Sequence, residues 1–167
     1  MGVWSGERVA RHIHGDDIKI NPNGVDLGIS EISRIEERST VIIQNGSKVI
    51  YPSIVDVTKS LLYDDDEVPS YSIPPGVYVV RLKNEISIPN GAVGLVFPRS
   101  TLNRYGIMMQ QTAVWDSGYR GYGTLTVRTD LKELRIGVDE KWFQLIFIDS
   151  DSVPSSDLYN GSYQNEK

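Results

Sequence analysis

The chain places a guanidinium beside two hydroxyls directly after an apolar run. Arg99, Ser100 and Thr101 follow the apolar segment 92–97 and Pro98. A guanidinium binds phosphate oxygens through paired N–H donors, and backbone N–H groups at a helix start add to such a site. The same residue types also form ordinary helix caps. The segment therefore predicts either a phosphate cradle or a simple helix start.

A single carboxylate stands 17 positions after Arg99. Asp116 follows Val114 and Trp115 and precedes a Ser-Gly pair. An acid between bulky apolar side chains and a glycine turn can lie at a hairpin edge, where it could orient and deprotonate a water molecule. Asp before Ser-Gly is equally typical of a turn without chemistry. Either feature alone is a weak signal.

The composition removes several other chemistries. The 167 residues contain no cysteine, which excludes disulfides, thiolate zinc sites and a cysteine nucleophile. His12 and His14 have a spacing that suits neither a zinc motif nor a helical i, i+4 pair. Polyphosphate chemistry is left open, because a few local cations can bind a small anion and a divalent cation such as Mg2+ can screen it.

Charge and hydropathy also bound the partners. The net charge of −5 argues against a broad nucleic-acid surface. No run approaches the ~20 apolar residues that a membrane-spanning helix needs. We therefore expect a cytoplasmic protein without a nucleic-acid or membrane partner. The acidic run 64–67 resembles a metal cage in composition, but it lacks the alternating spacing and glycine of a calcium loop, which favours a solvated loop.

The elements that must position the guanidinium, hydroxyl and carboxylate groups are predicted to be mostly short strands. A helix is expected from Ser5 to about Ile13, since Ser5 can cap it and Val9 and Ile13 would share a face. After it the apolar period is two, with turn residues between short β-branched runs. Strands are expected at 41–43, 48–51, 77–80, 92–97, 123–127 and 142–148. The pattern predicts an all-β sandwich, jelly roll or barrel over 1–152, followed by a flexible C-terminal arm over 153–167.

Four segments in order resemble the motifs of the dUTPase and dCTP deaminase superfamily. They are Asn23–Leu27, Pro98–Leu102, Ala113–Gly121 and Phe143–Phe147. The resemblance implies a distorted jelly-roll fold of the dUTPase β-clip type with a short N-terminal helix. It also implies a homotrimer with active sites at subunit interfaces.

The resemblance further implies roles for individual residues. Asp116 would activate the attacking water, with Mg2+ on the triphosphate. Asp26 would support the metal side of the site through water. The phosphates would be bound by Arg99, Ser100, Thr101, Arg104 and Gln144.

The nucleoside half is implied in the same way. Tyr119 would pack under the deoxyribose. The base would bind along Gln110, Gln111, Thr112 and Ala113. A lid would be formed from Tyr159, Tyr163 and Gln164 of the arm.

The superfamily contains hydrolases and deaminases, and particular residues separate them. A deaminase of this type uses a glutamate ten residues after the aspartate of the third motif, where this chain has Thr126. A threonine hydroxyl has no useful basicity near neutral pH. The nearest acids, Asp130 and Glu133, lie beyond the strand. Pro98 also resembles the hydrolase form of the second motif.

Other features are deaminase-like: Arg104, the Thr112-Ala113 pair, and a tail without the usual glycine-rich arm. The pattern as a whole resembles dUTPases of the deaminase-like branch found in archaea and their viruses. The expected activity is hydrolysis of dUTP to dUMP and pyrophosphate. Three alternatives are open: a dCTP deaminase, alone or bifunctional; a silent dNTP-binding regulatory relative; and an interaction domain with accidental matches.

Overall fold

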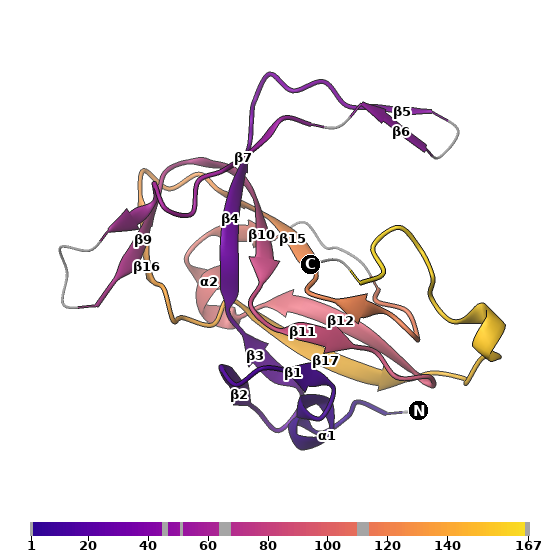
Figure 1. Cartoon of the computed structure of the whole chain (residues 1–167). Coiled ribbons are helices and arrows are strands. Elements are labelled where there is room, and N and C mark those ends of the chain that lie inside the picture. The colour runs from indigo at the N-terminus through magenta and orange to yellow at the C-terminus, as the bar shows by residue number, and fades with distance from the viewer. Residues whose placement is uncertain (1, 45–46, 51, 64–67, 110–113, 166–167) are drawn as a thin grey trace.

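The computed structural model describes residues 2–44, 47–50, 52–63, 68–109 and 114–165. These residues form short antiparallel strands with two α-helices and one 3-10 turn, as Figure 1 shows. None of the described helices has the length and apolar character needed to span a bilayer. The expected all-β class with a short N-terminal helix is confirmed.

A five-stranded sheet forms one layer of the fold. Its strands, in spatial order, are β13 (Ile107–Met109), β15 (Thr124–Thr129), β10 (Gly76–Leu82), β4 (Ile29–Ile35) and β7 (Ile54–Asp56). β10 is the central strand and pairs antiparallel with both β15 and β4.

A four-stranded sheet carries the segments that the sequence singled out. Its strands, in order, are β12 (Ala92–Pro98), β17 (Phe143–Asp149), β3 (Val25–Leu27) and β2 (Ile18–Ile20). Gln144 on β17 lies opposite Phe97 on β12 and Asp26 on β3. The ladder therefore brings the first, second and fourth motifs side by side.

The remaining strands form three small sheets. One contains β1 (Ile13–His14), β11 (Glu85–Ser87) and β14 (Arg120–Gly121). A second contains β8 (Leu62–Tyr63), β9 (Ser70–Ile73) and β16 (Leu134–Gly137). The third is the hairpin of β5 (Ile42–Gln44) and β6 (Ser47–Ile50), which projects from the body in Figure 1.

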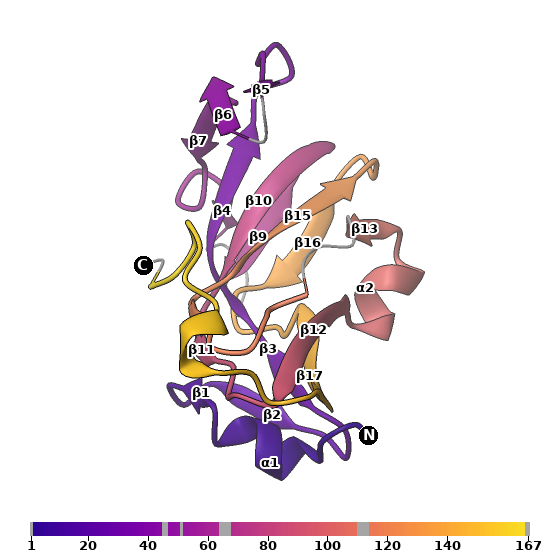
Figure 2. The ribbon, with the colours of Figure 1, turned by 90° about the vertical axis from the view of Figure 1, so that its right-hand side faces the viewer.

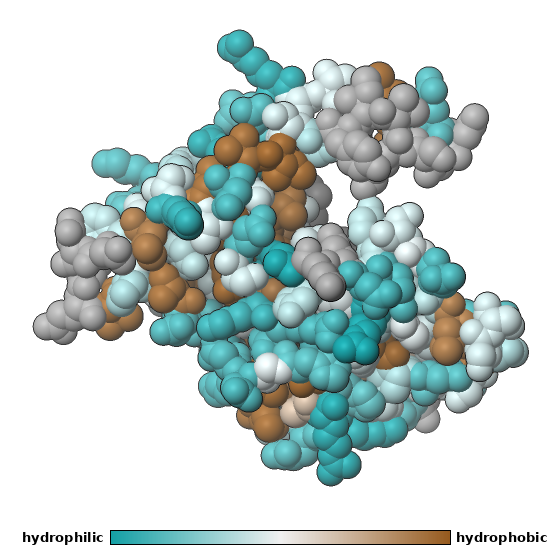
Figure 3. Space-filling model, in the orientation of Figure 1, coloured by the Kyte–Doolittle hydropathy of each residue, from teal (hydrophilic) through white to brown (hydrophobic). Residues whose placement is uncertain are grey.

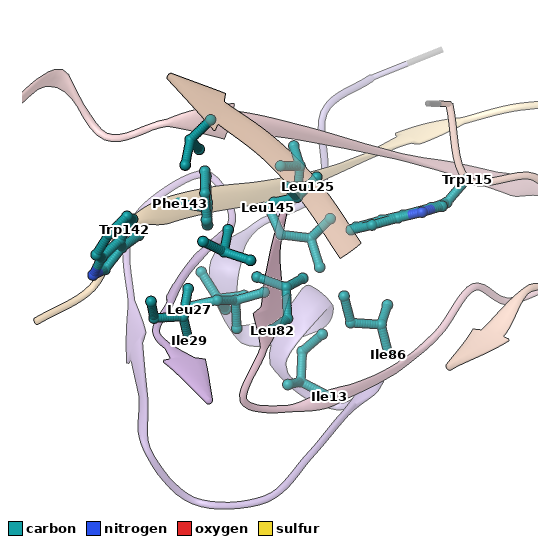
Figure 4. Close-up of a cluster of buried hydrophobic side chains, with 14 of the residues drawn as sticks. Ile13, Leu27, Ile29, Leu82, Ile86, Trp115, Leu125, Trp142, Phe143 and Leu145 are labelled. Atoms are coloured by element: carbon teal, nitrogen blue, oxygen red, sulfur yellow. The ribbon is translucent and has the colours of Figure 1, made fainter. Parts of the chain in front are cut away.

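The hydrophobic core lies between the two larger sheets. Alternate residues of β10, β12, β15 and β17 point into it, as the period of two requires. Figure 4 shows Leu27, Leu82, Leu125 and Leu145 converging from four different strands. The face in Figure 3 is mainly polar, with an apolar patch in the region where Figure 1 places β7. Two residues of β7, Ile54 and Val55, are exposed.

The predicted elements agree with the structure except at one helix end. All six expected strands are present within one or two residues. Helix α1 spans Gly6–Ala10, with the Ser5 side chain accepting from the Arg8 N–H. The expectation that it reaches Ile13 was wrong, because Ile13 pairs with Ile86 in β1 and β11. The acidic run 64–67 lies outside the described residues.

Candidate active site

The second motif begins where β12 ends. Pro98 is the last residue of β12, and Arg99 is an extended N-cap with φ −61° and ψ 147°. Helix α2 (Ser100–Arg104) follows. The Arg99 N–H donates to the Trp142 carbonyl at 2.9 Å, which ties the helix start to the chain before β17. Ser100 and Arg104 point into solvent.

The Arg99 guanidinium is fixed by three groups. Its Nε lies 3.0 Å from Asp26 Oδ2, and its Nη1 donates to the Lys141 carbonyl at 2.9 Å. The Glu140 carboxylate lies 3.6 Å from the same Nη1. The Arg99 side chain is 24% exposed. No residue in the described part of the chain engages Nη2, so these two donors are available to an anion.

Asp26 is buried and fully committed to neighbouring side chains. Only 5% of its side chain is exposed. Its Oδ2 faces Arg99, and its Oδ1 accepts from the Asn21 amide at 2.7 Å. Its buried charge is thus paired and hydrogen-bonded, which is the condition for keeping a charge out of water. The predicted role of Asp26 in supporting a metal through water stays a prediction.

An open groove adjoins Arg99. It has a volume of about 420 Å³. Its walls come from α2, β16 and the loop before β17, and include Arg99, Thr101, Tyr105, Arg135, Glu140 and Lys141. Three of these side chains are cationic, which suits an anionic ligand.

Gln144 stands beside this site on β17. Its amide Nε2 donates to the Asn23 carbonyl at 2.8 Å. Because Gln144 lies opposite Asp26 in the ladder, the fourth motif reaches the same end of the sheet as Arg99. The structure therefore brings together Asp26, Arg99, Thr101 and Gln144 among the predicted phosphate and metal residues.

Asp116 lies in a different place. The preceding residue, Trp115, pairs with Gly94 through two backbone hydrogen bonds of 2.9 Å on the free edge of β12. The Tyr119 N–H donates to the Asp116 carbonyl at 3.0 Å and closes a turn in which Gly118 has φ +92°. The Asp116 side chain is exposed, and within the described part of the chain its carboxylate forms no ion pair.

Tyr119 is held under this turn by aromatic neighbours. Its ring stacks on Trp115 at a centroid distance of 5.6 Å, and Tyr159 meets it edge-on at 5.7 Å. The Tyr119 hydroxyl accepts from the Gly123 N–H at 3.1 Å. Only 3% of Tyr119 is exposed with Tyr159 in this place. Its contact with a deoxyribose stays a prediction.

The C-terminal arm packs along the Asp116 turn of the same chain. The Tyr159 N–H donates to the Ser117 carbonyl at 2.9 Å. The Gln164 amide donates to the Gly118 carbonyl and accepts from the Arg120 N–H, both at 2.9 Å. The Tyr163 N–H donates to the Tyr159 hydroxyl at 3.3 Å. All three predicted lid residues thus belong to one segment laid over the turn.

The two parts of the predicted site are far apart within one chain. Arg99 lies five residues beyond Gly94, which corresponds to about 16 Å along an extended strand. Its guanidinium turns toward Asp26 on β3. β3 is two strands from β12 in the sheet, whereas Trp115 pairs with the other edge of β12. Figure 2 shows α2 and the arm on opposite sides of the molecule. The predicted base-binding residues Gln110, Gln111, Thr112 and Ala113 lie outside the described residues.

Sequence reasoning missed three residues of the arginine site: Asn21, Glu140 and Lys141. Asn21 precedes a Pro-Asn-Gly run, which is typical of a turn and hides any further role. Lys141 contributes a backbone carbonyl, which no side-chain pattern reveals. Its ammonium also pairs with Asp17, and hydrogen bonds from Lys141 and Lys83 lower the pKa of Asp17.

The chain matches a known protein family over most of its length. A family model described as dCTP deaminase-like matches residues 5–150. The chain belongs to the dCTP deaminase-like family. The membership that the four motifs predicted is confirmed, and the match covers every described strand.

Two relatives of this chain are named after an enzymatic activity. A Halobacterium salinarum protein is 35% identical over 167 residues, covering 97% of this chain and 93% of that protein. A Methanosarcina acetivorans protein is 32% identical over 151 residues, covering 90% and 83%. Both are named probable deoxyuridine 5'-triphosphate nucleotidohydrolase.

A solved structure supports the fold of this family member. The dCTP deaminase from Agrobacterium tumefaciens aligns with a TM-score of 0.62 at 16% identity. The alignment covers 89% of this chain, which spans about half (48%) of the other chain. At this identity the likeness concerns the fold, and it agrees with the expected jelly roll.

Proposed function

We propose that the chain is a dUTP nucleotidohydrolase that converts dUTP and water to dUMP and pyrophosphate. The observation that carries this proposal is similarity over nearly the whole chain to archaeal proteins of that name, at up to 35% identity. A nucleotide hydrolase also suits the arginine site and the exposed Asp116. Because the substrate is a DNA precursor, the expected location is the cytoplasm.

The position of Thr126 favours hydrolysis over deamination. Thr126 lies at the middle of β15, opposite Val79 on β10. The two acids that follow the strand are engaged elsewhere: Asp130 pairs with Arg128 at 3.0 Å, and Glu133 pairs with Arg135 at 3.0 Å. Hydrogen bonds from Ser72 and Arg135 lower the pKa of Glu133, which weakens it as a base. Neither acid takes the place of the missing glutamate.

The active site is proposed to form between copies of the chain. A water oriented by Asp116 must attack within a few ångströms of the phosphates, because reaction needs near-contact distances of ~3–3.5 Å. Asp116 and the Arg99 guanidinium of one chain are on opposite sides of β12. Arg99 of one copy and Asp116 of the next would then complete each site. Closed rotational symmetry turns this arrangement into identical sites, and the family resemblance favours a homotrimer.

One face of the four-stranded sheet suits such an assembly. Besides the polar Gln144, this face carries five apolar residues of β12 and β17 that are only partly covered: Val93, Leu95, Phe97, Ile146 and Ile148. Phe97 is 39% exposed. Contiguous exposed apolar side chains of this kind mark interaction surfaces. A second copy on this face would bury them beside the Arg99 site.

The chemical step is a single displacement at the α-phosphorus. Asp116 orients a water and accepts one of its protons, so that the water oxygen bonds to the α-phosphorus. The bond from the α-phosphorus to the bridging oxygen breaks, and pyrophosphate leaves with the electron pair. Arg99 holds the phosphates through its Nη2 donors. Positioning and charge stabilisation supply most of the acceleration in such reactions.

Mg2+ is proposed to enter with the substrate. The described residues contain no group of three His, Asp or Glu side chains able to hold a metal. The one buried acid of the site, Asp26, already binds Arg99 and Asn21. A resident metal cage does not fit these residues. Triphosphates carry Mg2+ themselves, with most of its other ligands being water.

Product analysis tests this function. The purified chain is incubated with Mg2+ and either dUTP or dCTP, and the nucleotides are separated by chromatography. The proposal predicts dUMP from dUTP and unchanged dCTP. Formation of dUTP or dUMP from dCTP would establish deamination. The chain would then use an acid elsewhere, because Thr126 stands at the position of the deaminase glutamate. No reaction with either nucleotide would leave a binding or regulatory role and contradict the proposal.

A further inference from the structure

Asn21 occupies a rigid turn between β2 and β3. The Asn21 N–H donates to the Gly24 carbonyl at 3.0 Å and closes the turn. The Gly6 N–H, at the start of α1, donates to the Pro22 carbonyl at 3.2 Å. Any side chain at Gly6 would collide with the Asn21 carbonyl, so α1 packs directly on the turn.

The other side of the turn is fixed by β17. Gly24 has φ +95°, and a side chain there would collide with the Leu145 carbonyl. The Gln144 amide donates to the Asn23 carbonyl at 2.8 Å. Contacts with α1 and β17 thus leave the Asn21 backbone little freedom. A side chain on such a support has a well-defined direction.

The Asn21 amide donates to Asp26 Oδ1 at 2.7 Å, a short distance for an N–H donor to a carboxylate. Asp26 Oδ2 faces Arg99 Nε at 3.0 Å. The two carboxylate oxygens therefore have one partner each. With Asn21 on one oxygen, rotation of the carboxylate away from Arg99 would leave the partly buried Asn21 donor unpaired.

We propose that Asn21 is a positioning residue for substrate phosphates: it fixes the Asp26 carboxylate, which in turn holds Arg99 with its Nη2 edge toward the triphosphate. This inference rests on the proposed phosphate role of Arg99. In this proposal Asn21 acts through its hydrogen bond to Asp26 and not through direct contact with the substrate. It supplies a neutral donor, so the pair of Asp26 and Arg99 keeps one negative and one positive charge.

The test measures binding of inorganic tripolyphosphate by calorimetry in the wild-type chain, Asn21→Ala and Asn21→Asp. Asn21→Ala removes the donor. Asn21→Asp keeps the size but presents an acceptor to Asp26. The matched control is Asn23→Ala in the same turn, because the exposed Asn23 contributes only a backbone carbonyl, which alanine retains.

Both Asn21 variants are expected to bind tripolyphosphate about tenfold more weakly than wild type, in line with the loss of one hydrogen bond to a charged group. Asn23→Ala is expected to stay within about twofold. With dUTP, KM should rise about tenfold and kcat should change less, because Asp116 and its water are untouched. A structural defect alone would not produce this split. Circular dichroism confirms folding, and Asn21→Asp decides the question if Asn21→Ala does not fold.

Several results would overturn the inference. Tripolyphosphate binding within twofold of wild type in either folded Asn21 variant would do so, as would an equal loss in Asn23→Ala. A wild-type chain that does not bind tripolyphosphate would remove its basis. The probe lacks base and sugar, so a wild-type chain that binds it without hydrolysing dUTP refutes the proposed function and leaves the Asn21 comparison decisive.

Discussion

The two ends of β12 carry different kinds of site. At the arginine end, a 24% exposed guanidinium is tied to a buried carboxylate and a backbone carbonyl. At the other end, Asp116 is exposed, and the turn around it is fixed by backbone bonds, the Ser117 hydroxyl, the Trp115–Tyr119 stack and the arm. A group that binds phosphate gains from being held before substrate arrives, because the ordering cost is then already met. A group that handles water must face solvent.

The proposed shared site follows from this comparison. The rigid end and the exposed end point away from each other, so in the proposed assembly each copy would contribute a binding half to one site and a reacting half to another. Substitutions at the exposed end should change the rate with little effect on stability. Substitutions at the arginine end should change both.

The largest expected effect is on the turnover rate, from substitution of Asp116 in its turn. Asp116→Asn should lower kcat about 10³-fold, since loss of a general base commonly costs 10²–10⁴. Binding of a non-hydrolysable dUTP analogue should stay within about threefold, and the free energy of unfolding within about 0.5 kcal/mol. Steady-state kinetics, calorimetry and chemical denaturation measure these three quantities. Near-wild-type turnover would eliminate Asp116 as the base.

Asp26→Asn should mainly lower stability and raise KM, whereas Asp116→Asn should mainly lower kcat. It removes the charge that faces Arg99, and the free energy of unfolding should fall by about 1–3 kcal/mol. For a chain of this size Tm should fall by about 2–4 °C per kcal/mol. KM for dUTP should rise, because Arg99 is no longer held. Denaturation of this variant beside Asp116→Asn checks the comparison, and equal stabilities would contradict it.

The arm offers a smaller effect. Gln164→Ala removes two hydrogen bonds to the backbone of the Asp116 turn. At about 0.5 kcal/mol for each of these two largely solvent-accessible bonds, or about 1 kcal/mol together, the arm should open about fivefold more often. Hydrogen exchange at the Tyr159 amide, which donates to Ser117, reports this opening. Asn160→Ala, an exposed residue of the same arm, is the control and should exchange like wild type.

The smallest effect concerns Asp17, which pairs with Lys83 at 2.7 Å and with Lys141 beside Arg99. Its folded pKa is lowered from 3.8, first by the hydrogen bond from Lys141. A lowered pKa means that the pair stabilises the fold above pH 3.8 and that this contribution is lost as pH falls below it. Because Asp17 is 39% exposed, solvent screening limits the effect to about 0.5 kcal/mol. Asp17→Asn should thus lower Tm slightly at pH 7 and by less at pH 2. An equal difference at both values would contradict this assignment.

The sequence predicted six of the seventeen described strands, because alternation is a local pattern, and it missed others such as β4. Six apolar runs of period two became strands. The helix end failed at Ile13 because its partner, Ile86, is distant in the chain, so no local pattern places it in a sheet. Val9 and Ile13 have a spacing that suits a helix equally well.

The site was predictable in its residue types and not in its geometry. Arg99 and Asp116 were recognisable from their motifs. The pairing of Arg99 with Asp26 depends on the order β12-β17-β3, which no spacing reveals. Asn21 was hidden by its turn context, and Lys141 acts through a backbone carbonyl. The separation of the two halves also required the fold, because 17 positions in sequence are compatible with direct contact.

The central claim, dUTP hydrolysis at a site shared between copies, is tested most directly by mixing two inactive variants. Arg99→Ala and Asp116→Asn are unfolded together, refolded at a ratio of one to one, and assayed with dUTP. Each shared site takes its arginine and its aspartate from different copies, so both are intact in about a quarter of sites by random assembly. The account predicts recovery to about one quarter of wild-type kcat. A mixture as inactive as its components would contradict it.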